Sequence, residues 1–397
     1  MLIQRHAETT LLQLAKEYPA VAVTGPRQSG KTTLVRKAFP DKPYLSLEDL
    51  DERQFATDDP RGFLGRYPDG AILDEVQRCP ELFSYLQTRI DQAKKKGLFV
   101  LTGSQQFNLL SGITQSLAGR VALIPLLPFT LGELQAAKMA PMQLSELLFR
   151  GLYPPLYDGR EQAGIWYGNY MRTYIERDVR QMINVQDLST FQRFVRMCAG
   201  RTGQLTNLSA LAGDCGVSHN TAKAWLSVLE ASYIVHLLQP HHRNFEKRLV
   251  KTAKLYFWDT GLACWLLGIR APAELDSHAQ RGALFETWVV GELLKARYNR
   301  GLESNLYFWR DRSGNEVDVL IDEGDRLAPV EIKAGQTVSR DFFRGLERWQ
   351  ALAKEASGKA TLIYGGEKSQ NRLGPQVVPW AGIGSFARQL ASATTSK

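Results

Sequence analysis

The sequence has few cysteines and no long hydrophobic run. Its four cysteines are scattered without CxxC or Cys/His spacing, which argues against a zinc site or a disulfide framework. No stretch of eighteen uncharged apolar residues is present, and Arg5, His6 and Glu8 interrupt the N-terminus where a secretory signal has its apolar centre. We therefore expect a cytoplasmic protein that does not span a membrane.

The 397 residues are enough for more than one hydrophobic core, since 44% of them are hydrophobic and single cores stop growing at about 250 to 300 residues. Strand and helix patterns alternate up to about residue 150, which predicts a parallel sheet. A helical stretch follows, and a second α/β pattern begins near residue 246. The net charge of +8 permits a polyanionic partner but is also common on ordinary soluble surfaces.

A phosphate-binding motif follows the first apolar strand. The strand ends at Thr24, and the next residues fit G-x-x-x-x-G-K-[ST] directly before a predicted helix. We expect the loop N–H groups to bind the phosphates of ATP, Lys31 to reach the β and γ phosphates, and Thr32 to ligate Mg²⁺. The predicted nucleotide-binding residues are Gly25, Pro26, Arg27, Gln28, Ser29, Gly30, Lys31, Thr32 and Thr33.

Two carboxylates end another predicted strand. Ala71-Ile72-Leu73 is followed by Asp74 and Glu75, at the carboxyl edge of the sheet, where ligands bind in open α/β folds. We expect Asp74 to hold magnesium and Glu75 to act as the general base toward the attacking water. An acidic pair after an apolar run often only begins a loop, but beside a P-loop it predicts a Walker B site and ATP hydrolysis.

Two further residues are candidates for a part in hydrolysis. Ser104 follows the strand predicted at 98–101 and is placed to sense the γ-phosphate or to position water, with Thr102 and Gln105 as alternatives. Arg120 is the candidate arginine finger, a group that contributes about 10³ to 10⁵ in rate in P-loop hydrolases. A surface or structural role is the alternative interpretation of Arg120.

These residues stand within longer characteristic segments: Thr24–Gln28 with Gly30–Thr32, Leu73–Gln77, Leu101–Gln105, Gly119–Val121, Gly151–Pro154, Glu176–Val179, Phe257–Gly261 and Phe285–Glu286. Together they resemble a family of prokaryotic AAA-type ATPases in which a P-loop domain is joined to a C-terminal domain of uncharacterised function. The resemblance covers nearly the whole chain. It implies a sheet whose sensor strand lies between the P-loop and Walker B strands, and it usually implies assembly between protomers. It implies no known substrate.

The middle of the chain has helix-turn-helix spacing. Residues 205–212 and 220–231 read as helices around a turn at 215–218, and 232–238 would begin a wing. Ser218 is expected to cap the second helix. The side chains expected to enter a DNA major groove are those of His219, Asn220, Thr221 and Lys223. Such modules also serve as inter-domain or protein-docking units, so both interpretations stay open.

A nuclease-like pattern lies near the C-terminus. Residues 316–321 and 330–333 read as neighbouring strands, with Asp318 on the first and Glu331 and Lys333 on one face of the second. With Glu286 on a preceding helix, this order is that of PD-(D/E)XK nucleases. Asp318 and Glu331 would hold magnesium and Glu286 would assist. Lys333 would orient water or help to deprotonate it. Ordinary charges on a sheet surface would have the same local pattern.

The sequence thus predicts an α/β protein with three domains: a P-loop AAA-like ATPase domain at 1–150, a helical and winged-helix domain at 151–245, and a nuclease-like domain at 246–390. The leading hypothesis is an ATP-driven switch linked to nucleic acid, with DNA favoured and a homo-oligomer compatible with it. One alternative is a nucleotide-gated, metal-dependent nuclease. Another is an ATPase that docks a protein partner without nucleic acid.

Overall fold

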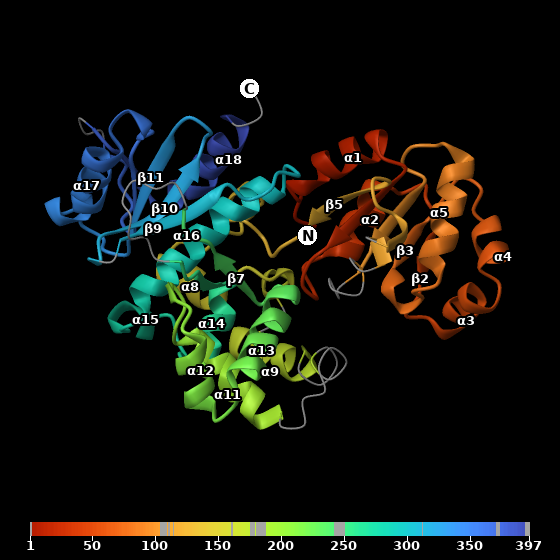
Figure 1. Cartoon of the computed structure of the whole chain (residues 1–397), viewed down its shortest axis with the longest axis horizontal. Helices are drawn as coiled ribbons and strands as arrows, with labels where there is room; N and C mark the ends of the chain where they lie inside the picture. The colour runs from red at the N-terminus through yellow and green to blue at the C-terminus, as the bar shows by residue number, and fades with distance from the viewer. Residues whose placement is uncertain are drawn as a thin grey trace. The chain divides into compact units, whose positions relative to one another are not determined.

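The computed structural model of the chain describes residues 2–103, 109, 112–113, 115–159, 162–174, 179, 188–241, 251–311, 313–370 and 374–393. The chain divides into two compact units, which are treated one at a time (Figure 1). Unit 1 consists of residues 1–129, 231–233 and 298–302, and unit 2 consists of 130–230, 234–297 and 303–397. The three domains predicted from the sequence, at 1–150, 151–245 and 246–390, stay a prediction.

Unit 1 is built around a parallel sheet with the strand order β2-β3-β4-β1-β5 (Figure 1). The strands are β1 Ala20–Thr24, β2 Tyr44–Ser46, β3 Ile72–Asp74, β4 Phe99–Thr102 and β5 Val121–Pro125. Because β4 lies between β1 and β3, the strand order implied by the family resemblance is confirmed. β1, β3 and β4 match strands predicted from the sequence, whereas β5 was not predicted.

Helices cover both faces of this sheet, which explains why its strands are apolar throughout rather than alternating. One face carries α1 Ala7–Glu17 and α2 Lys31–Ala38, whose apolar side chains pack on β1 and β5. The other face carries α3 Leu50–Asp58, α4 Pro60–Gly65 and α5 Leu82–Ala93. Because the strands are parallel, the carboxyl ends of β1, β3 and β4 lie at the same edge of the sheet.

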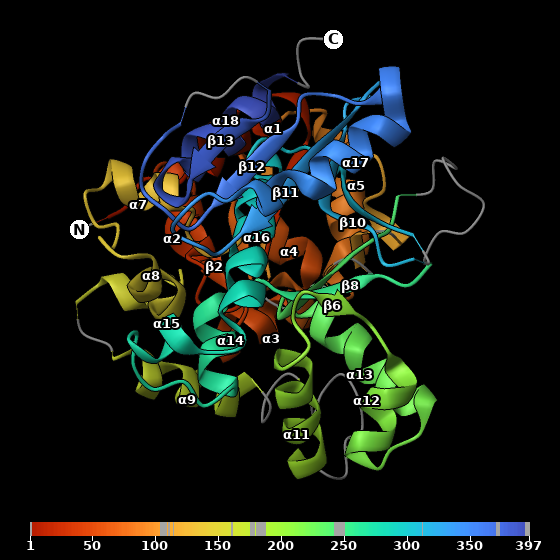
Figure 2. The same ribbon diagram turned by 90° about the vertical axis from the view of Figure 1, so that its left-hand side faces the viewer.

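The first part of unit 2 is mostly helical. Its helices are α7 Leu131–Ala136, α8 Leu144–Arg150, α9 Ala163–Tyr174, α11 Leu188–Ala199, α12 Leu208–Cys215, α13 His219–Ala231, α14 Thr260–Leu266 and α15 Glu274–Ser277. Its three-stranded antiparallel sheet has the order β6-β8-β7, formed by β6 Gln204–Leu205, β7 Val235–Leu238 and β8 Lys254–Phe257. Figure 2 shows α12 and α13, in green, side by side.

A buried carboxylate ties this helical part together. The carboxylate of Asp259 accepts hydrogen bonds from the N–H of Leu262, which caps α14, from the N–H of Leu152 and from the hydroxyl of Tyr167 on α9. Two of the characteristic segments, Gly151–Pro154 and Phe257–Gly261, therefore contact each other through Asp259. Of the segment Glu176–Val179, only Val179 lies within the described residues.

The second part of unit 2 is a mixed sheet with the order β13-β12-β11-β10-β9 (Figure 2). The strands are β9 Leu306–Arg310, β10 Glu316–Asp322, β11 Leu327–Lys333, β12 Thr361–Tyr364 and β13 Gln376–Pro379. β9, β10 and β11 are antiparallel neighbours, while β11, β12 and β13 run parallel. The accompanying helices are α16 Arg281–Tyr298, α17 Arg344–Ala353 and α18 Ile383–Ala393.

The helices of this second part differ in their surroundings. α17 packs on one face of the sheet through Leu346 and Trp349, while α16 is buried along most of its length. Short 3₁₀ helices are η1 Val76–Arg78, η2 Pro154–Tyr157, η4 Arg340–Phe343, η5 Lys354–Ala356 and η6 Trp380–Gly382. Among the described residues, none of the helices is long and apolar enough to cross a bilayer.

Candidate functional site

The loop between β1 and α2 has the backbone that a phosphate-binding loop needs. Gly25 and Gly30 have φ angles of 138° and 91°, which favour glycine, and a Cβ on Gly25 would overlap the carbonyl of Leu126. Lys31 is buried, and its ammonium donates hydrogen bonds to the carbonyls of Gly25 and Pro26 at 3.0 and 2.7 Å. The cation is thereby held against the loop, at the N-terminus of α2.

The carboxylate of Asp74 gathers hydroxyl groups from three other elements. Its Oδ2 accepts from Thr32 at 2.9 Å and from the Tyr44 hydroxyl at 2.5 Å, and its Oδ1 accepts from Thr102. Burial and the hydrogen bond to Asp74 raise the pKa of Tyr44, which keeps this hydroxyl a donor. Thr32 and Asp74, the predicted metal ligands, thus lie in contact. Their hard oxygen atoms suit Mg²⁺.

Glu75 has an unusual backbone. Its φ of 54° and ψ of 42° are left-handed, a conformation that costs roughly 1–3 kcal/mol for a residue other than glycine and that clusters at functional sites. The buried amide of Gln77 donates a hydrogen bond to the Glu75 carboxylate and so orients it. Gln77 was not singled out from the sequence, although it ends the characteristic segment Leu73–Gln77.

An arginine near the N-terminus contacts the phosphate-binding loop. Arg5 is buried and donates hydrogen bonds to the carbonyls of Ser29, at 2.7 Å, and Leu127, at 2.5 Å. Its guanidinium also lies 4.9 Å from the centre of the Phe129 ring. Arg5 therefore fixes the loop relative to the segment after β5. No sequence motif marks this residue, because its partners are backbone atoms far along the chain.

The other residues predicted to take part in hydrolysis lie in different parts of the structure or outside the described residues. Ser104 and Gln105 lie outside the described residues, and Thr102 contacts Asp74 as described. Arg120 precedes β5, and its carbonyl accepts from the N–H of Ala20. It therefore lies at the amino end of β1, a strand length of about 16 Å from the P-loop.

The side chain of Arg120 is engaged locally. Its guanidinium donates hydrogen bonds to both carboxylate oxygens of Asp91, at 2.7 and 2.9 Å. Because it lies at the opposite edge of the sheet, Arg120 does not reach the P-loop of its own chain. Its action as a finger on a neighbouring protomer stays a prediction.

The predicted DNA-contacting residues lie together at the start of α13. His219, Asn220 and Lys223 are exposed, and Thr221 is half-buried. The opposite face of α13 is buried, in agreement with the amphipathic pattern. The Ser218 hydroxyl accepts from the Thr221 N–H at 3.1 Å, as expected of a capping residue. The winged-helix assignment and contact with DNA stay predictions.

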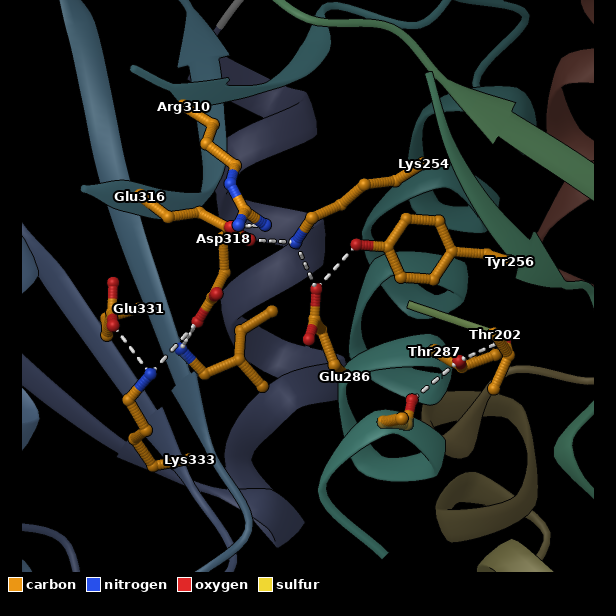
Figure 3. A network of polar contacts seen from close by, with 12 residues as sticks. Thr202, Lys254, Tyr256, Glu286, Thr287, Arg310, Glu316, Asp318, Glu331 and Lys333 are labelled. Carbon is orange, nitrogen blue, oxygen red and sulfur yellow. Dashed lines mark hydrogen bonds and ion pairs between the residues drawn. The ribbon is translucent and has the colours of Figure 1, made fainter. Parts of the chain in front are cut away.

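The predicted nuclease-like residues meet in unit 2 (Figure 3). Lys333 Nζ lies 2.6 Å from Glu331 and 3.4 Å from Asp318, and Asp318 also accepts from the N–H of Ile332 at 2.8 Å. The fourth residue, Glu286, comes from α16. One carboxylate oxygen from each of Glu286, Glu316 and Asp318 lies within 4.8 Å of the others.

Four further residues of this cluster were not predicted. Glu316 lies two residues before Asp318 on β10, so its position on the same face of the strand was a usable signal. Lys254 and Tyr256 belong to β8, which no sequence motif connects with the nuclease-like pattern. Arg310, on β9, lies 3.0 Å from Glu316.

The ionisation of Lys254 is governed by these acids. Burial by itself lowers the pKa of Lys254, but nearby Tyr256, Glu286, Asp318 and Glu316 outweigh it and raise the pKa well above its usual value. Lys254 is therefore charged in spite of being buried. Burial and the charge of Asp318 raise the pKa of Glu331 against the opposing effect of Lys333.

Two mycobacterial proteins resemble this chain over most of its length. The uncharacterized proteins Mb2031c of Mycobacterium bovis and Rv2008c of Mycobacterium tuberculosis are each 32% identical over 374 residues, covering 92% of this chain and 81% of theirs. The chain belongs to their family. The AAA domain matches residues 17–135, and the domains of unknown function DUF8612 and DUF4143 match 142–273 and 281–383.

The chain thus has a P-loop AAA domain joined to a C-terminal domain of unknown function, which confirms that much of the predicted resemblance. Among solved structures, the Walker-type ATPase of Pyrococcus abyssi aligns with a TM-score of 0.47 and 15% identity, over 67% of this chain and 96% of that one. AMPPCP-bound DnaA from Aquifex aeolicus aligns with a TM-score of 0.29 and 14% identity, over 56% and 85% of the two chains.

The Arg5 contacts predict an effect on nucleotide affinity. Arg5→Ala should weaken ATP binding about tenfold, or ~1.4 kcal/mol, because two hydrogen bonds that preorganise the loop are lost. The matched control is Arg66→Ala, since Arg66 also lies over a phenylalanine of unit 1, Phe55, at 4.2 Å. Titration with a fluorescent ATP analogue measures both variants. Equal affinities for Arg5→Ala and Arg66→Ala would contradict the assignment.

Proposed function

We propose that the protein hydrolyses ATP to ADP and phosphate at the P-loop of unit 1. The observation that carries the proposal is the contact of Thr32 with Asp74 beside a Glu75 carboxylate oriented by Gln77. Lys31 and the loop N–H groups bind the phosphates. Mg²⁺, held by Thr32 and Asp74, would neutralise charge on the β and γ phosphates.

In the hydrolytic step, a water oxygen attacks the γ-phosphorus while Glu75 accepts the proton of that water. The bond from the γ-phosphorus to the β–γ bridging oxygen breaks, and ADP leaves with the electron pair. Thr102 and Tyr44 hold the Asp74 carboxylate in place during the step. Ser104 is proposed to position water, and Arg120 of a neighbouring protomer to stabilise the transition state. The active form would then be a homo-oligomer.

Substitution of Glu75 separates binding from hydrolysis. Glu75→Gln should bind ATP as tightly as the wild type but turn it over about 100-fold more slowly or worse, since general-base catalysis contributes about 10² to 10⁴. Lys31→Ala serves as the binding-deficient comparison. Phosphate release and nucleotide titration give the two readouts. Wild-type turnover by Glu75→Gln would remove the general base from the proposal.

We further infer that the nucleotide state is transmitted to α13. The hydroxyls of Thr24 and Tyr233 are 2.7 Å apart in a buried hydrogen bond. Thr24 is the last residue of β1, directly before the P-loop, and Tyr233 follows α13 by two residues. A rearrangement of the loop at Gly25 therefore acts on a hydrogen bond held by the end of α13.

The backbone at Tyr233 supports this inference. The N–H of Ile234 bonds to the carbonyl of Leu229, which is the pattern of a helix terminated by a left-handed residue, usually glycine. Here the left-handed residue is Tyr233, with φ of 56°, a conformation that costs about 1–2 kcal/mol for residues with a Cβ. The contact with Thr24 accounts for a tyrosine at a position where glycine would be less strained.

Like residues 231–233, residues 298–302 come from the later half of the chain and belong to unit 1. The hydroxyl of Thr10 on α1 donates to the carbonyl of Asn299 at 2.8 Å, and Gly301 approaches the same threonine. These residues directly follow α16, the helix that carries Glu286. Both α13 and α16 therefore end in segments that pack within the ATPase unit.

We propose nucleic acid, with DNA favoured, as the partner of the exposed start of α13. This proposal is supported by the exposed basic side chains of His219 and Lys223 on a helix whose other face is buried. The net charge of +8 agrees with a polyanionic partner. A protein partner at the same face is the alternative, and it would give binding that depends little on salt.

The α13 face predicts a change in duplex affinity. His219→Ala with Lys223→Glu should weaken duplex DNA binding about tenfold or more and reduce the slope of log K against log salt by about 1, as loss of a phosphate contact requires. The control is Lys359→Glu, which makes the same charge change at another exposed site of unit 2. Salt-dependent fluorescence anisotropy measures both. Unchanged affinity and slope in the α13 variant would exclude this helix.

A further inference from the structure

The acidic cluster of unit 2 contains a lysine among its carboxylates. Lys254 Nζ lies 3.0 Å from Glu286 and forms a second ion pair with Glu316. Its side chain is 2% exposed. In Figure 3 the ammonium reaches the carboxylates from the β8 side, opposite to Glu331 and Lys333. Two of the three acids that would hold a divalent cation are thus bound to Lys254.

The same acids accept hydrogen bonds from further donors. Tyr256 donates to Glu286 at 2.5 Å, and Arg310 pairs with Glu316 at 3.0 Å. Asp318 accepts from the Ile332 N–H and from Lys333. Every acid of the candidate metal group therefore has protein donors fixed by β8, β9 or β11.

These contacts do not fit a magnesium site. Mg²⁺ requires octahedral geometry at about 2.0–2.1 Å and keeps several of its waters. At this cluster it would share the acids with donors that are held by strands, and it would lie beside a buried ammonium, where charge repulsion is weakly screened. The four carboxylates of the cluster already face three protein cations, namely Lys254, Arg310 and Lys333.

We propose that the Lys254 ammonium is the resident cation of the group formed by Glu286, Glu316 and Asp318, in place of a divalent metal. The core is then an ion-paired scaffold and does not cleave phosphodiesters by a metal-dependent route. The ion pairs join β8 to α16 and β10. Because β8 is the central strand between β6 and β7, they attach the three-stranded sheet to the C-terminal core.

The test maps bound metal directly, without relying on enzymatic activity. Nucleotide-free full-length protein is loaded with Fe²⁺ and treated with ascorbate and peroxide, and backbone cuts made by locally generated hydroxyl radicals are identified by mass spectrometry. Wild type should show no cuts near Glu286, Glu316 and Asp318. Lys254→Ala should gain such cuts and bind Mn²⁺ about tenfold more tightly than wild type. Lys254→Arg, which keeps the cation, should behave as wild type.

Removal of Lys254 leaves buried carboxylates without a counter-charge and can destabilise the fold. A second variant, which also removes a negative charge, is therefore tested in parallel. Lys254→Met with Glu316→Gln removes one charge of each sign and should also gain cuts near Glu286 and Asp318. All eight tryptophans lie in unit 2, so their fluorescence checks that each variant is folded there. Cuts at the cluster in wild type, or the absence of cuts in folded Lys254→Ala or in the folded Lys254→Met and Glu316→Gln double variant, would overturn the proposal. Neither result depends on ATP turnover.

Discussion

The arrangement of strands and helices in unit 1 depends on one buried carboxylate. Asp74 at the end of β3 binds hydroxyls from α2, β2 and β4 at once, so the helix after the P-loop and three strands are fixed relative to each other by a single side chain. Because a buried carboxylate without donors is costly, these contacts keep Asp74 hydrogen-bonded to Thr32 of α2.

The same unit includes short segments from the later half of the chain, and this gives the proposed switch its physical basis. Phosphate binding acts on the loop that begins at Gly25, and the preceding residue is hydrogen-bonded to Tyr233. A switch requires a ligand to favour one of two arrangements. The Thr24–Tyr233 hydrogen bond and the strained backbone of Tyr233 after α13 form a part of the structure whose arrangement bound nucleotide can change. In unit 2, the Lys254 ion pairs give the candidate metal site a structural role instead.

Local patterns predicted much of this structure. The apolar runs of β1 to β4, the P-loop and the acidic pair at residues 74 and 75 each have a short-range signature, and the structure confirms the strand order. Alternation on β10 and β11 also placed Asp318, Glu331 and Lys333 correctly on adjoining strands. Arg5, Tyr233 and Lys254 were missed because each contacts a partner far away in sequence, through backbone carbonyls, a lone hydroxyl or a buried ion pair. No periodicity encodes such contacts.

We propose that nucleotide at the P-loop changes the end of α13 through Tyr233. The decisive measurement is hydrogen–deuterium exchange of the nucleotide-free wild type compared with ATP-bound Glu75→Gln. Altered exchange is expected at both the P-loop and residues 229–234. In the Tyr233→Phe background, which removes only the hydroxyl, the change at 229–234 should disappear while that at the P-loop persists. A change confined to the P-loop, or one at 229–234 that survives Tyr233→Phe, would contradict it.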